Sequence, residues 1–335
     1  MSRPAEHPPV ESPRIGVLLI NLGTPDAPEP SAVRRYLAEF LTDPRVIEIP
    51  PWLWRPILHG VVLRLRPAKS AHAYRQVWTE EGSPLAAITR RQAQALQQQL
   101  GQKVIVDHAM RYGKPGIAGA IERMTAAGCA RILAAPLYPQ YCAATTASAN
   151  DALFAAVAGL RRQPALRTLP PYYDDPLYIE ALNANLSRQL AALDFEPQRL
   201  LLSFHGMPQR TLELGDPYHC HCQKTARLLG EALGRPVDIA FQSRFGRAKW
   251  LQPATDATLT AYPAQGIDRI AIAAPGFSAD CLETLEELGI RGRDSFLAAG
   301  GAHFARLDCL NDSPEGMTML EQLVLRELEG WRAAT

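Results

Sequence analysis

The chain has 335 residues, enough for about two domains of ordinary size. Its 35 lysine and arginine residues nearly balance 34 aspartate and glutamate residues, which argues against a polyanion-binding surface, so we expect no nucleic acid partner. Residues 1–13 lack the apolar core of a signal peptide, and no stretch approaches the ~20 apolar residues of a spanning helix. We therefore expect a cytoplasmic protein that is at most peripheral on the inner face of a membrane.

The cysteines are too few and too irregularly spaced for the disulfide framework of a secreted protein. They are Cys129, Cys142, Cys220, Cys222, Cys281 and Cys309. Reduced thiols are the expectation.

Short runs rich in Val, Ile and Leu recur along the chain, separated by longer stretches with helical spacing such as residues 90–100. Such runs, apolar throughout, are typical of strands buried on both faces of a parallel sheet that is covered by helices. They lie at residues 15–20, 104–106, 132–137, 200–204, 237–241 and 270–275. The pattern predicts an α/β protein.

Three segments of the first half recur in the same order in the second half. "LLINLGTP" (18–25) matches "LLSFHGMP" (201–208), "RYG" (111–113) matches "RFG" (244–246), and "AAPLY" (134–138) matches "AAPGF" (273–277). Each lies at the end of a predicted strand, which indicates duplicated domains with pseudo-two-fold symmetry. Because ligands bind beyond the carboxyl ends of parallel strands, we expect the site between the two halves.

A connector rich in Pro and Asp at 167–176 predicts the boundary between the halves. We expect an N-terminal half at 14–166, a C-terminal half at 176–312 that carries the chemistry, and a docking helix within 313–335. Helical spacing places five apolar residues on one face of that last segment, namely Met317, Leu320, Val324, Leu328 and Trp331.

The two matched corners differ at one position, where the first half has Leu22 and the second half has His205. A lone histidine is often a capping residue or a satisfied core residue. The strand-end position and the change from leucine favour a functional role instead. A neutral imidazole accepts a proton or binds a divalent metal at neutral pH.

The segment "SADCLETLEELG" (278–289) predicts a helix that Ser278 or Asp280 caps and that Gly289 ends. Asp280, Glu283 and Glu287 fall at i, i+3 and i+7, which places three carboxylates on one face of an α-helix. The opening turn of a helix at the predicted site favours a functional role for Glu283. The corresponding stretch of the first half, "QYCAATTASAN", has no acid.

A solvated acidic face explains Glu286 and Glu287 equally well.

"HCHC" (219–222) contains four good zinc ligands, but adjacent residues do not readily surround one tetrahedral ion. Arginines near the strand ends are suited to pairing with carboxylates of a ligand, and nearby aromatic residues are suited to lining it, although ordinary packing between the halves explains them too. The arginines are Arg111, Arg244 and Arg247, and the aromatic residues are Tyr112, Tyr138, Trp250 and Phe277. Fingerprints for dinucleotides, P-loop phosphates and the nucleophile elbow are absent from the sequence.

Taken together, the motifs resemble those of the ferrochelatase family, whose members insert ferrous iron into a porphyrin in the last step of haem synthesis. The resemblance runs from about Ile15 to Asp312 and is most specific in "LLSFHGMPQRTLELGDPY", "FQSRFGRAKWLQPATDATL" and "APGFSADCLETLEELG". It implies two similar Rossmann-like α/β domains with a chelatase-like duplication around a porphyrin cleft. It also implies that the segment around Glu283 is wound as a π-helix.

The resemblance places the essential histidine at His205 and the active-site glutamate at Glu283, and both are candidate metal ligands. It assigns the substrate-binding positions to Asn21, Leu22, Arg111, Tyr112, Tyr138, Trp250 and Asp280. We expect His205 to accept the two pyrrole protons of a distorted macrocycle and Glu283 to act as its relay or counter-charge. Iron would approach from the aromatic and Asn21 side. An acidic path along Glu283 and Glu287 would resemble the family's route for metal or protons.

Fe(II) is then a substrate, and we expect no permanently bound cofactor and a monomer that acts on protoporphyrin IX. Family members with an iron-sulfur cluster use a cysteine one place from Cys142 and others in a C-terminal extension, whereas no cysteine follows Cys309 here. An iron-sulfur cluster is therefore not expected. Cys281 stands where some relatives have a histidine, which weakens the case for a third ligand.

Two other functions fit the same pattern: a protein that binds haem without catalysis, and a chelatase that inserts cobalt or nickel into another tetrapyrrole. The apolar stretch at 50–67 contains Trp and Arg residues suited to a lip that touches lipid. A helix packed on the body of the protein explains that stretch equally well.

Overall fold

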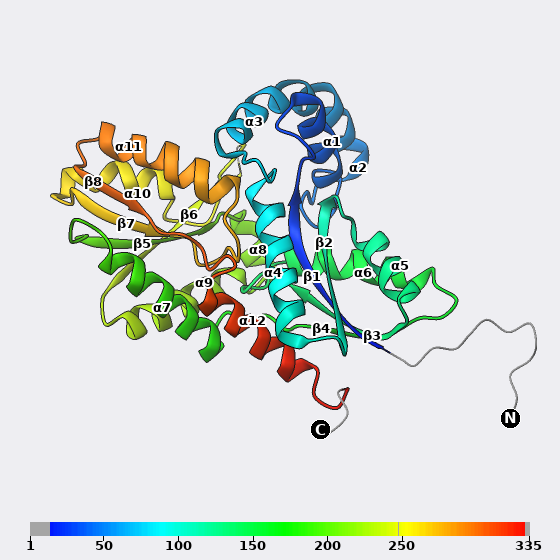
Figure 1. The fold of residues 1–335 in the computed structure, drawn as a ribbon. Helices are drawn as coiled ribbons and strands as arrows, with labels where there is room; N and C mark the ends of the chain where they lie inside the picture. Colours follow the sequence, from blue (N-terminus) through cyan, green and yellow to red (C-terminus); the bar gives the residue numbers. More distant parts are fainter. Residues whose placement is uncertain (1–13, 247, 332–335) are drawn as a thin grey trace, which may run out of the picture.

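The computed structural model describes residues 14–246 and 248–331, which form two four-stranded sheets that are parallel throughout. The strands of the first are β1 (Arg14–Thr24), β2 (Val104–Gly113), β3 (Cys129–Pro136) and β4 (Ala165–Thr168), and those of the second are β5 (Arg199–His205), β6 (Val237–Gln242), β7 (Arg269–Ala273) and β8 (His303–Arg306). Their orders, β2-β1-β3-β4 and β6-β5-β7-β8, are the same (Figure 1). The predicted α/β fold with a duplicated unit is confirmed.

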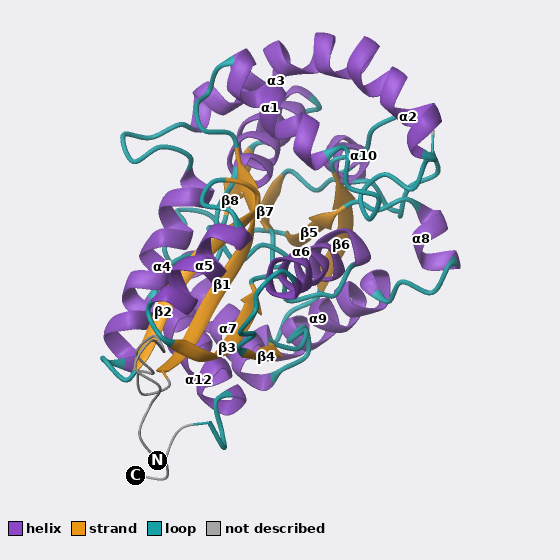
Figure 2. Ribbon diagram, turned by 90° about the vertical axis from the view of Figure 1, so that its right-hand side faces the viewer, coloured by secondary structure: helices purple, strands orange, loops and turns teal. Residues whose placement is uncertain are grey.

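Helices repeat in the same order, and they cover both faces of the sheets (Figure 2). Between the first two strands lies α4 (Pro84–Leu100) in the first half and α9 (Tyr218–Leu233) in the second. Between the second and third strands lies α5 (Ile117–Ala126) in the first half and α10 (Thr255–Ala261) in the second. After the third strand come a π-helix and an α-helix, η2 (Ala143–Ala147) with α6 (Ser148–Ala158) and η4 (Glu283–Gly292) with α11 (Arg293–Ala298). Each unit is followed by one more helix, α7 (Pro176–Ala191) or α12 (Pro314–Glu327). The short α8 (Gln209–Glu213) and the 3₁₀ turn η3 (Pro263–Gln265) have no counterpart in the first half.

The first half also carries an insertion between β1 and α4, which forms the upper part of the molecule in Figure 1. It consists of α1 (Pro30–Phe40), α2 (Pro51–Ile57), the π-helix η1 (Leu58–Val62) and α3 (Leu63–Val77). Val33, Ala71 and Tyr74 of this insertion form a buried cluster against which Leu282 packs. The insertion therefore contacts the second half directly beside η4.

Alternate residues of the central strands enter different cores, as period-two geometry requires. Val17 and Leu19 of β1 share the largest apolar core with Leu200 and Leu202 of β5. Leu18 and Ile20 instead pack under α5 and α6. The largest core is thus common to both halves, with α4 and α12 packed on the first sheet and α9 on the second.

Helix α12 packs against α7 and α4, with Met317, Leu320, Val324 and Leu328 buried and Trp331 against the same core. Because α12 follows β8 as α7 follows β4, the two helices occupy matching places in the repeat. The division of the chain at 14–166, 176–312 and 313–335 stays a prediction.

The matched corners both need a glycine because each passes close to the neighbouring strand. A Cβ at Gly23, which has φ +109°, would lie 1.8 Å from the carbonyl oxygen of Tyr112. A Cβ at Gly206 would lie 2.4 Å from the carbonyl oxygen of Gln242, which accepts a 2.7 Å hydrogen bond from the Gly206 N–H. Any side chain there must push the two strands apart.

Gly206→Ala is expected to lower the free energy of unfolding by about 2 kcal/mol, because the added methyl group overpacks the β5–β6 contact. Equilibrium unfolding in urea measures the change. Gly60→Ala in η1 is the matched control, since no atom lies within 4 Å of its Cβ position. Equal stabilities of the two variants would contradict the close approach at Gly206.

Candidate functional site

His205 is the last residue of β5 and pairs with Gln242, the last residue of β6. Its Nδ1 lies 2.7 Å from the carbonyl oxygen of Gly206. A carbonyl oxygen only accepts, so a neutral His205 must carry its proton on Nδ1 to form this hydrogen bond. The lone pair is then on Nε2, which is the form of imidazole that accepts a proton or binds a metal.

The segment after β7 contains a π-helix, η4, which begins at Glu283 as the resemblance implies. The predicted helix boundaries are wrong. Asp280 lies three residues before η4, and the helical run continues through Gly289 and into α11. A Cβ at Gly289 would lie 2.9 Å from Cδ of Arg306, so this glycine makes room for the arginine and does not end the helix.

Asp280 is buried among partners of its own half. Its Oδ1 accepts hydrogen bonds from Thr284 Oγ1 at 2.7 Å and from Arg306 Nη1 at 3.0 Å, and its Oδ2 accepts one from Asn311 Nδ2 at 2.7 Å. The predicted acidic face of Asp280, Glu283 and Glu287 therefore does not form, because Asp280 precedes the helix. The contacts support a role for Asp280 in holding the start of η4, and its substrate-binding role stays a prediction.

The acids inside η4 differ in their partners. Glu286 is buried and pairs with Arg291 at 2.9 Å, five residues further on, which is the hydrogen-bonding step of a π-helix. Glu287 accepts hydrogen bonds from the N–H and the Oγ of Ser243 at 2.8 and 2.5 Å. Among the residues that the structure describes, Glu283 is in no ion pair.

Gln242 connects the strand of His205 to the helix of Glu283. Its Nε2 donates a 3.1 Å hydrogen bond to the carbonyl oxygen of Glu283, and its Oε1 accepts one from Ser203 Oγ at 2.8 Å. Because Gln242 also pairs with His205, the structure brings both candidate catalytic residues to the same strand ends. The sequence analysis missed Gln242, although it stands at the end of a predicted strand in "FQSRFG".

The first half reaches this region through β1 and the insertion. Leu22 packs against Ala279 and Cys281, which immediately precede η4. Burial raises the pKa of Tyr36 and Tyr74 well above the ordinary value, and the nearby Glu283 carboxylate adds to the rise in the pKa of each. Residues of α1 and α3 therefore line the surroundings of Glu283, a contribution that the sequence analysis did not find.

Asn21 is buried, and its side chain forms hydrogen bonds with two residues of the first half. Its Nδ2 donates to Thr89 Oγ1 at 3.1 Å, and its Oδ1 accepts the Leu22 N–H at 2.9 Å. The amide thereby fixes the corner from which Leu22 extends.

Arg111 and Tyr112 converge on Asp43, a residue that the sequence analysis also missed. Asp43 Oδ2 accepts hydrogen bonds from Arg111 Nη2 at 2.5 Å, Tyr112 Oη at 2.7 Å and Ser148 Oγ at 2.5 Å. Arg111 also lies over the Tyr112 ring, 4.4 Å from its centroid. Tyr138 is close enough to Arg111 and Tyr112 for their charges to influence its pKa, which burial raises above the ordinary value.

Trp250 lies beside the corner that follows His205, with its ring 3.4 Å from the position of a Cβ at Gly206 and its Nε1 donating to the Phe245 carbonyl oxygen at 3.0 Å. Arg66 of α3 lies over the Phe245 ring, 5.0 Å from its centroid, and so links the insertion to the loop after β6. Arg244 pairs with the exposed Asp256 at 2.7 Å, and Arg247 lies outside the described residues.

The four ligands of "HCHC" lie in the first turns of α9 with different surroundings. Cys220 is exposed, Cys222 is buried, and the His221 ring stacks on Tyr173 with centroids 3.5 Å apart. Within residues 14–246 and 248–331, no group of three or more His, Cys, Asp or Glu side chains is arranged to hold a metal ion. Iron in this protein is considered below as a substrate.

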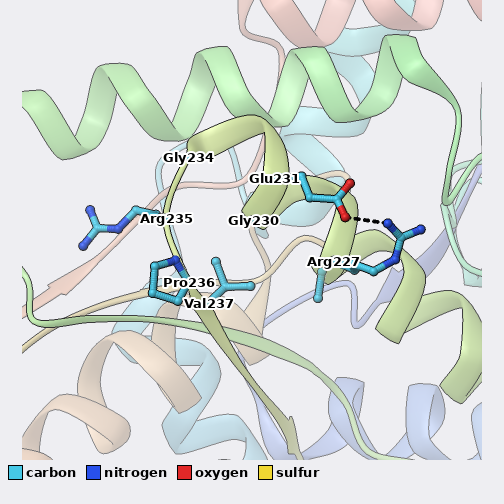
Figure 3. A pocket seen from close by; sticks show the side chains of 8 residues that line it. Arg227, Gly230, Glu231, Gly234, Arg235, Pro236 and Val237 are labelled. Atoms are coloured by element: carbon cyan, nitrogen blue, oxygen red, sulfur yellow. Dashed lines mark hydrogen bonds and ion pairs between the residues drawn. The ribbon is translucent and has the colours of Figure 1, made fainter.

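The hollow in Figure 3 is not part of this region. Its lining comes from the end of α9 and the start of β6, and the Arg227–Glu231 ion pair lies at its edge. Val237 is at the amino end of β6, whereas Gln242 and the neighbouring His205 are at the carboxyl ends of their strands. The hollow and the candidate site therefore lie at opposite ends of the sheet.

Asp43→Asn is expected to lower the free energy of unfolding at neutral pH by about 2–3 kcal/mol, because it weakens three hydrogen bonds to a buried charge. Burial alone would raise the pKa of Asp43, but hydrogen bonds from Ser148 and Tyr112, the Arg45 N–H and the charge of Arg111 together lower it. A lowered pKa stabilises the fold above the pKa of the unfolded chain, about 3.9, and this stabilisation is lost as the pH falls further.

Urea unfolding of the Asp43→Asn variant between about pH 7 and pH 3 measures the effect. The difference from the unmodified protein should shrink toward the acid end. Asp151→Asn is the control, because Asp151 forms an exposed ion pair with Arg45 at 2.8 Å. A difference that is constant with pH would contradict the proposed charge state of Asp43.

Comparison with known proteins shows the fold and the family of the chain. A solved structure of SirB from Bacillus subtilis with Fe3+ matches 95% of the chain and 96% of its own, with a TM-score of 0.53 at 13% identity, which shows a shared fold. A ferrochelatase from Rhizobium meliloti (strain 1021) is 54% identical over 338 residues, covering 99% of this chain and all of that protein. A ferrochelatase from Methylibium petroleiphilum is 53% identical over 328 residues, covering 96% and 90%. The family model described as Ferrochelatase matches residues 14–328, and the chain therefore belongs to the ferrochelatase family.

Proposed function

We propose that this chain inserts Fe(II) into a porphyrin to give haem, and that His205 and Glu283 carry out the chemistry. Membership of the ferrochelatase family supports the reaction. The observation that supports the two residues is that Gln242 joins the end of the His205 strand to the first residue of η4.

The reaction exchanges two protons for one divalent ion. A free-base porphyrin keeps two N–H hydrogens in the hole that the metal must enter, so iron enters as these protons leave. An enzyme that binds a puckered macrocycle exposes the pyrrole nitrogens and approaches the geometry of the transition state. The protein must therefore supply a proton acceptor on one face and a path for the cation.

His205 is suited to accepting the pyrrole protons. The Gly206 carbonyl holds the proton of a neutral imidazole on Nδ1, which leaves Nε2 as the acceptor. The ring stands at the end of a strand whose backbone is fixed by pairing with Gln242, so its orientation does not depend on a flexible loop.

Glu283 is suited to taking the proton onward or to balancing the charge of the entering ion. Asp280 and Glu286 are paired with Arg306 and Arg291, whereas no described cation pairs with Glu283. A carboxylate and an imidazole bind Fe(II) without the strong affinity of thiolates, so they can release it to the macrocycle. The remaining wall would come from Asn21, Leu22, Arg111, Tyr112, Tyr138, Trp250 and Asp280.

We further propose protoporphyrin IX as the acceptor, a monomeric enzyme, and no resident cofactor or iron-sulfur cluster.

His205→Ala and Glu283→Gln are each expected to lower the rate of iron insertion at least about 100-fold, because each removes a proton acceptor. The assay mixes porphyrin with anaerobic Fe(II) and follows the loss of porphyrin fluorescence. His303→Ala and Glu122→Gln are the controls, because both side chains are exposed and lie outside the site. Full activity in either site variant would overturn its assigned role.

The same assay separates the enzyme from a haem-binding protein. Catalytic turnover of porphyrin is expected, whereas quenching that stops at one equivalent would indicate a binder. A preference for cobalt or nickel over Fe(II) would indicate another chelatase.

We also propose that the insertion contacts a membrane surface through α2, η1 and α3. Leu58 and Leu63 are buried against Leu41 within the insertion, whereas Trp52 and Leu65 are 78% and 72% exposed. Leu53, Ile57 and Val61 extend this apolar face, and Arg55 and Arg64 are exposed beside it. Such a mixture suits the interface between lipid headgroups and acyl chains. No helix among the described residues has the length and apolar character needed to cross a bilayer.

Replacing Trp52 and Leu65 together by Ser is expected to weaken binding to anionic lipid vesicles at least about tenfold, because two exposed apolar side chains leave the contact. Vesicle co-sedimentation measures the binding. Phe154→Ser is the control, since Phe154 is an exposed apolar residue on α6 and lies outside this face. Equal binding of all three proteins would refute the contact.

A further inference from the structure

Two residues other than glycine have a left-handed backbone within the described ranges, Ser243 at φ 63° and Asn311 at φ 51°. Both hold a carboxylate of the segment that contains Glu283. Ser243 binds Glu287, and Asn311 binds Asp280. Residues other than glycine rarely adopt this backbone conformation. Where they do, the surrounding structure must compensate for the strain.

Ser243 follows Gln242 directly, and these neighbours hold two successive turns of η4. Gln242 binds the carbonyl oxygen of Glu283, and Ser243 binds the carboxylate of Glu287 through both its N–H and its Oγ. The left-handed backbone allows both donors of Ser243 to meet the same carboxylate. Arg291 adds a distant contact to that carboxylate at 3.8 Å.

Glu287 stands four residues after Glu283, about one turn along the helix, so the two carboxylates lie on nearly the same side. Fixing the Glu287 side chain against the end of β6 thereby fixes the rotation of η4 about its axis. That rotation decides where the Glu283 side chain points relative to the strand that carries His205.

We propose that Ser243 is a positioning residue, which orients Glu283 for iron insertion by holding Glu287. The inference rests on the proposed function. It assigns no contact with porphyrin or iron to Ser243. The strained backbone is then maintained because it places both hydrogen-bond donors on one carboxylate.

Ser243→Gly tests this role, because it removes the hydroxyl while glycine adopts the left-handed backbone easily. We expect kcat for iron insertion to fall about tenfold, the loss expected from one charge-assisted hydrogen bond, while the thermal midpoint stays level or rises. Ser243→Ala should lose the same activity but unfold at a lower temperature, because alanine is strained at this φ. Ser295→Ala on α11 is the matched control, since that serine is exposed.

A double-mutant cycle with Glu287→Gln establishes whether Ser243 acts through Glu287. The double variant Ser243→Gly with Glu287→Gln should be no slower than Glu287→Gln alone. Unchanged kcat in Ser243→Gly, or independent losses that multiply in the double variant, would overturn the inference while the unmodified protein still inserts iron. Absence of iron insertion in the unmodified protein would instead refute the proposed function.

Discussion

The hydrogen bond from the Gly206 N–H to the Gln242 carbonyl oxygen is the contact on which the geometry of the site depends. It continues the β5–β6 pairing one residue beyond His205, so the imidazole leaves the sheet from a fixed backbone. The side chain of Gln242 then reaches the backbone of Glu283. One short strand end therefore sets the positions of an imidazole and a carboxylate that are 78 residues apart in the chain.

Duplication explains why this contact has a counterpart with different chemistry. Gly23 approaches Tyr112 as Gly206 approaches Gln242, and both halves wind a π-helix after their third strand. Leu22 takes the place of His205, and η2 has no acidic residue. In the first half, Leu22 packs against the segment before η4. Asp43 is buried there and accepts hydrogen bonds from Arg111 and Tyr112. The repeat thus supplies a rigid wall on one side and titratable groups on the other.

Much of the fold follows from the sequence because buried parallel strands are apolar throughout. The central strands and the three matched corners could be predicted for this reason. The edge strands β4 and β8 could not, since each has four residues and neither contains a continuous apolar run. Within the site, His205 and Glu283 are recognisable from the repeat and the family motifs.

The partners that hold these residues are harder to predict, because they come from distant segments and have no pattern of their own. Asp43 meets Arg111 across 68 residues, and Ser243 meets Glu287 across 44. Gly289 could not be explained from the sequence either, because a glycine at that position is typical of a helix end. The structure shows that a side chain is excluded there because Arg306 passes close by on its way to Asp280.

The electrostatics of the acidic segment depend on pairing rather than on the number of acids. Four carboxylates within eight residues would repel one another and would resist burial if left unpaired. Arg306 pairs with Asp280, Arg291 pairs with Glu286, and the N–H and Oγ of Ser243 both donate to the Glu287 carboxylate. These interactions order the segment and leave Glu283 as its one carboxylate that is in no ion pair among the described residues. If Glu283 takes part in iron insertion as we propose, its carboxylate is the one in this segment that an entering divalent cation meets without a paired arginine among the described residues. Its backbone lies one hydrogen bond away from the strand of His205.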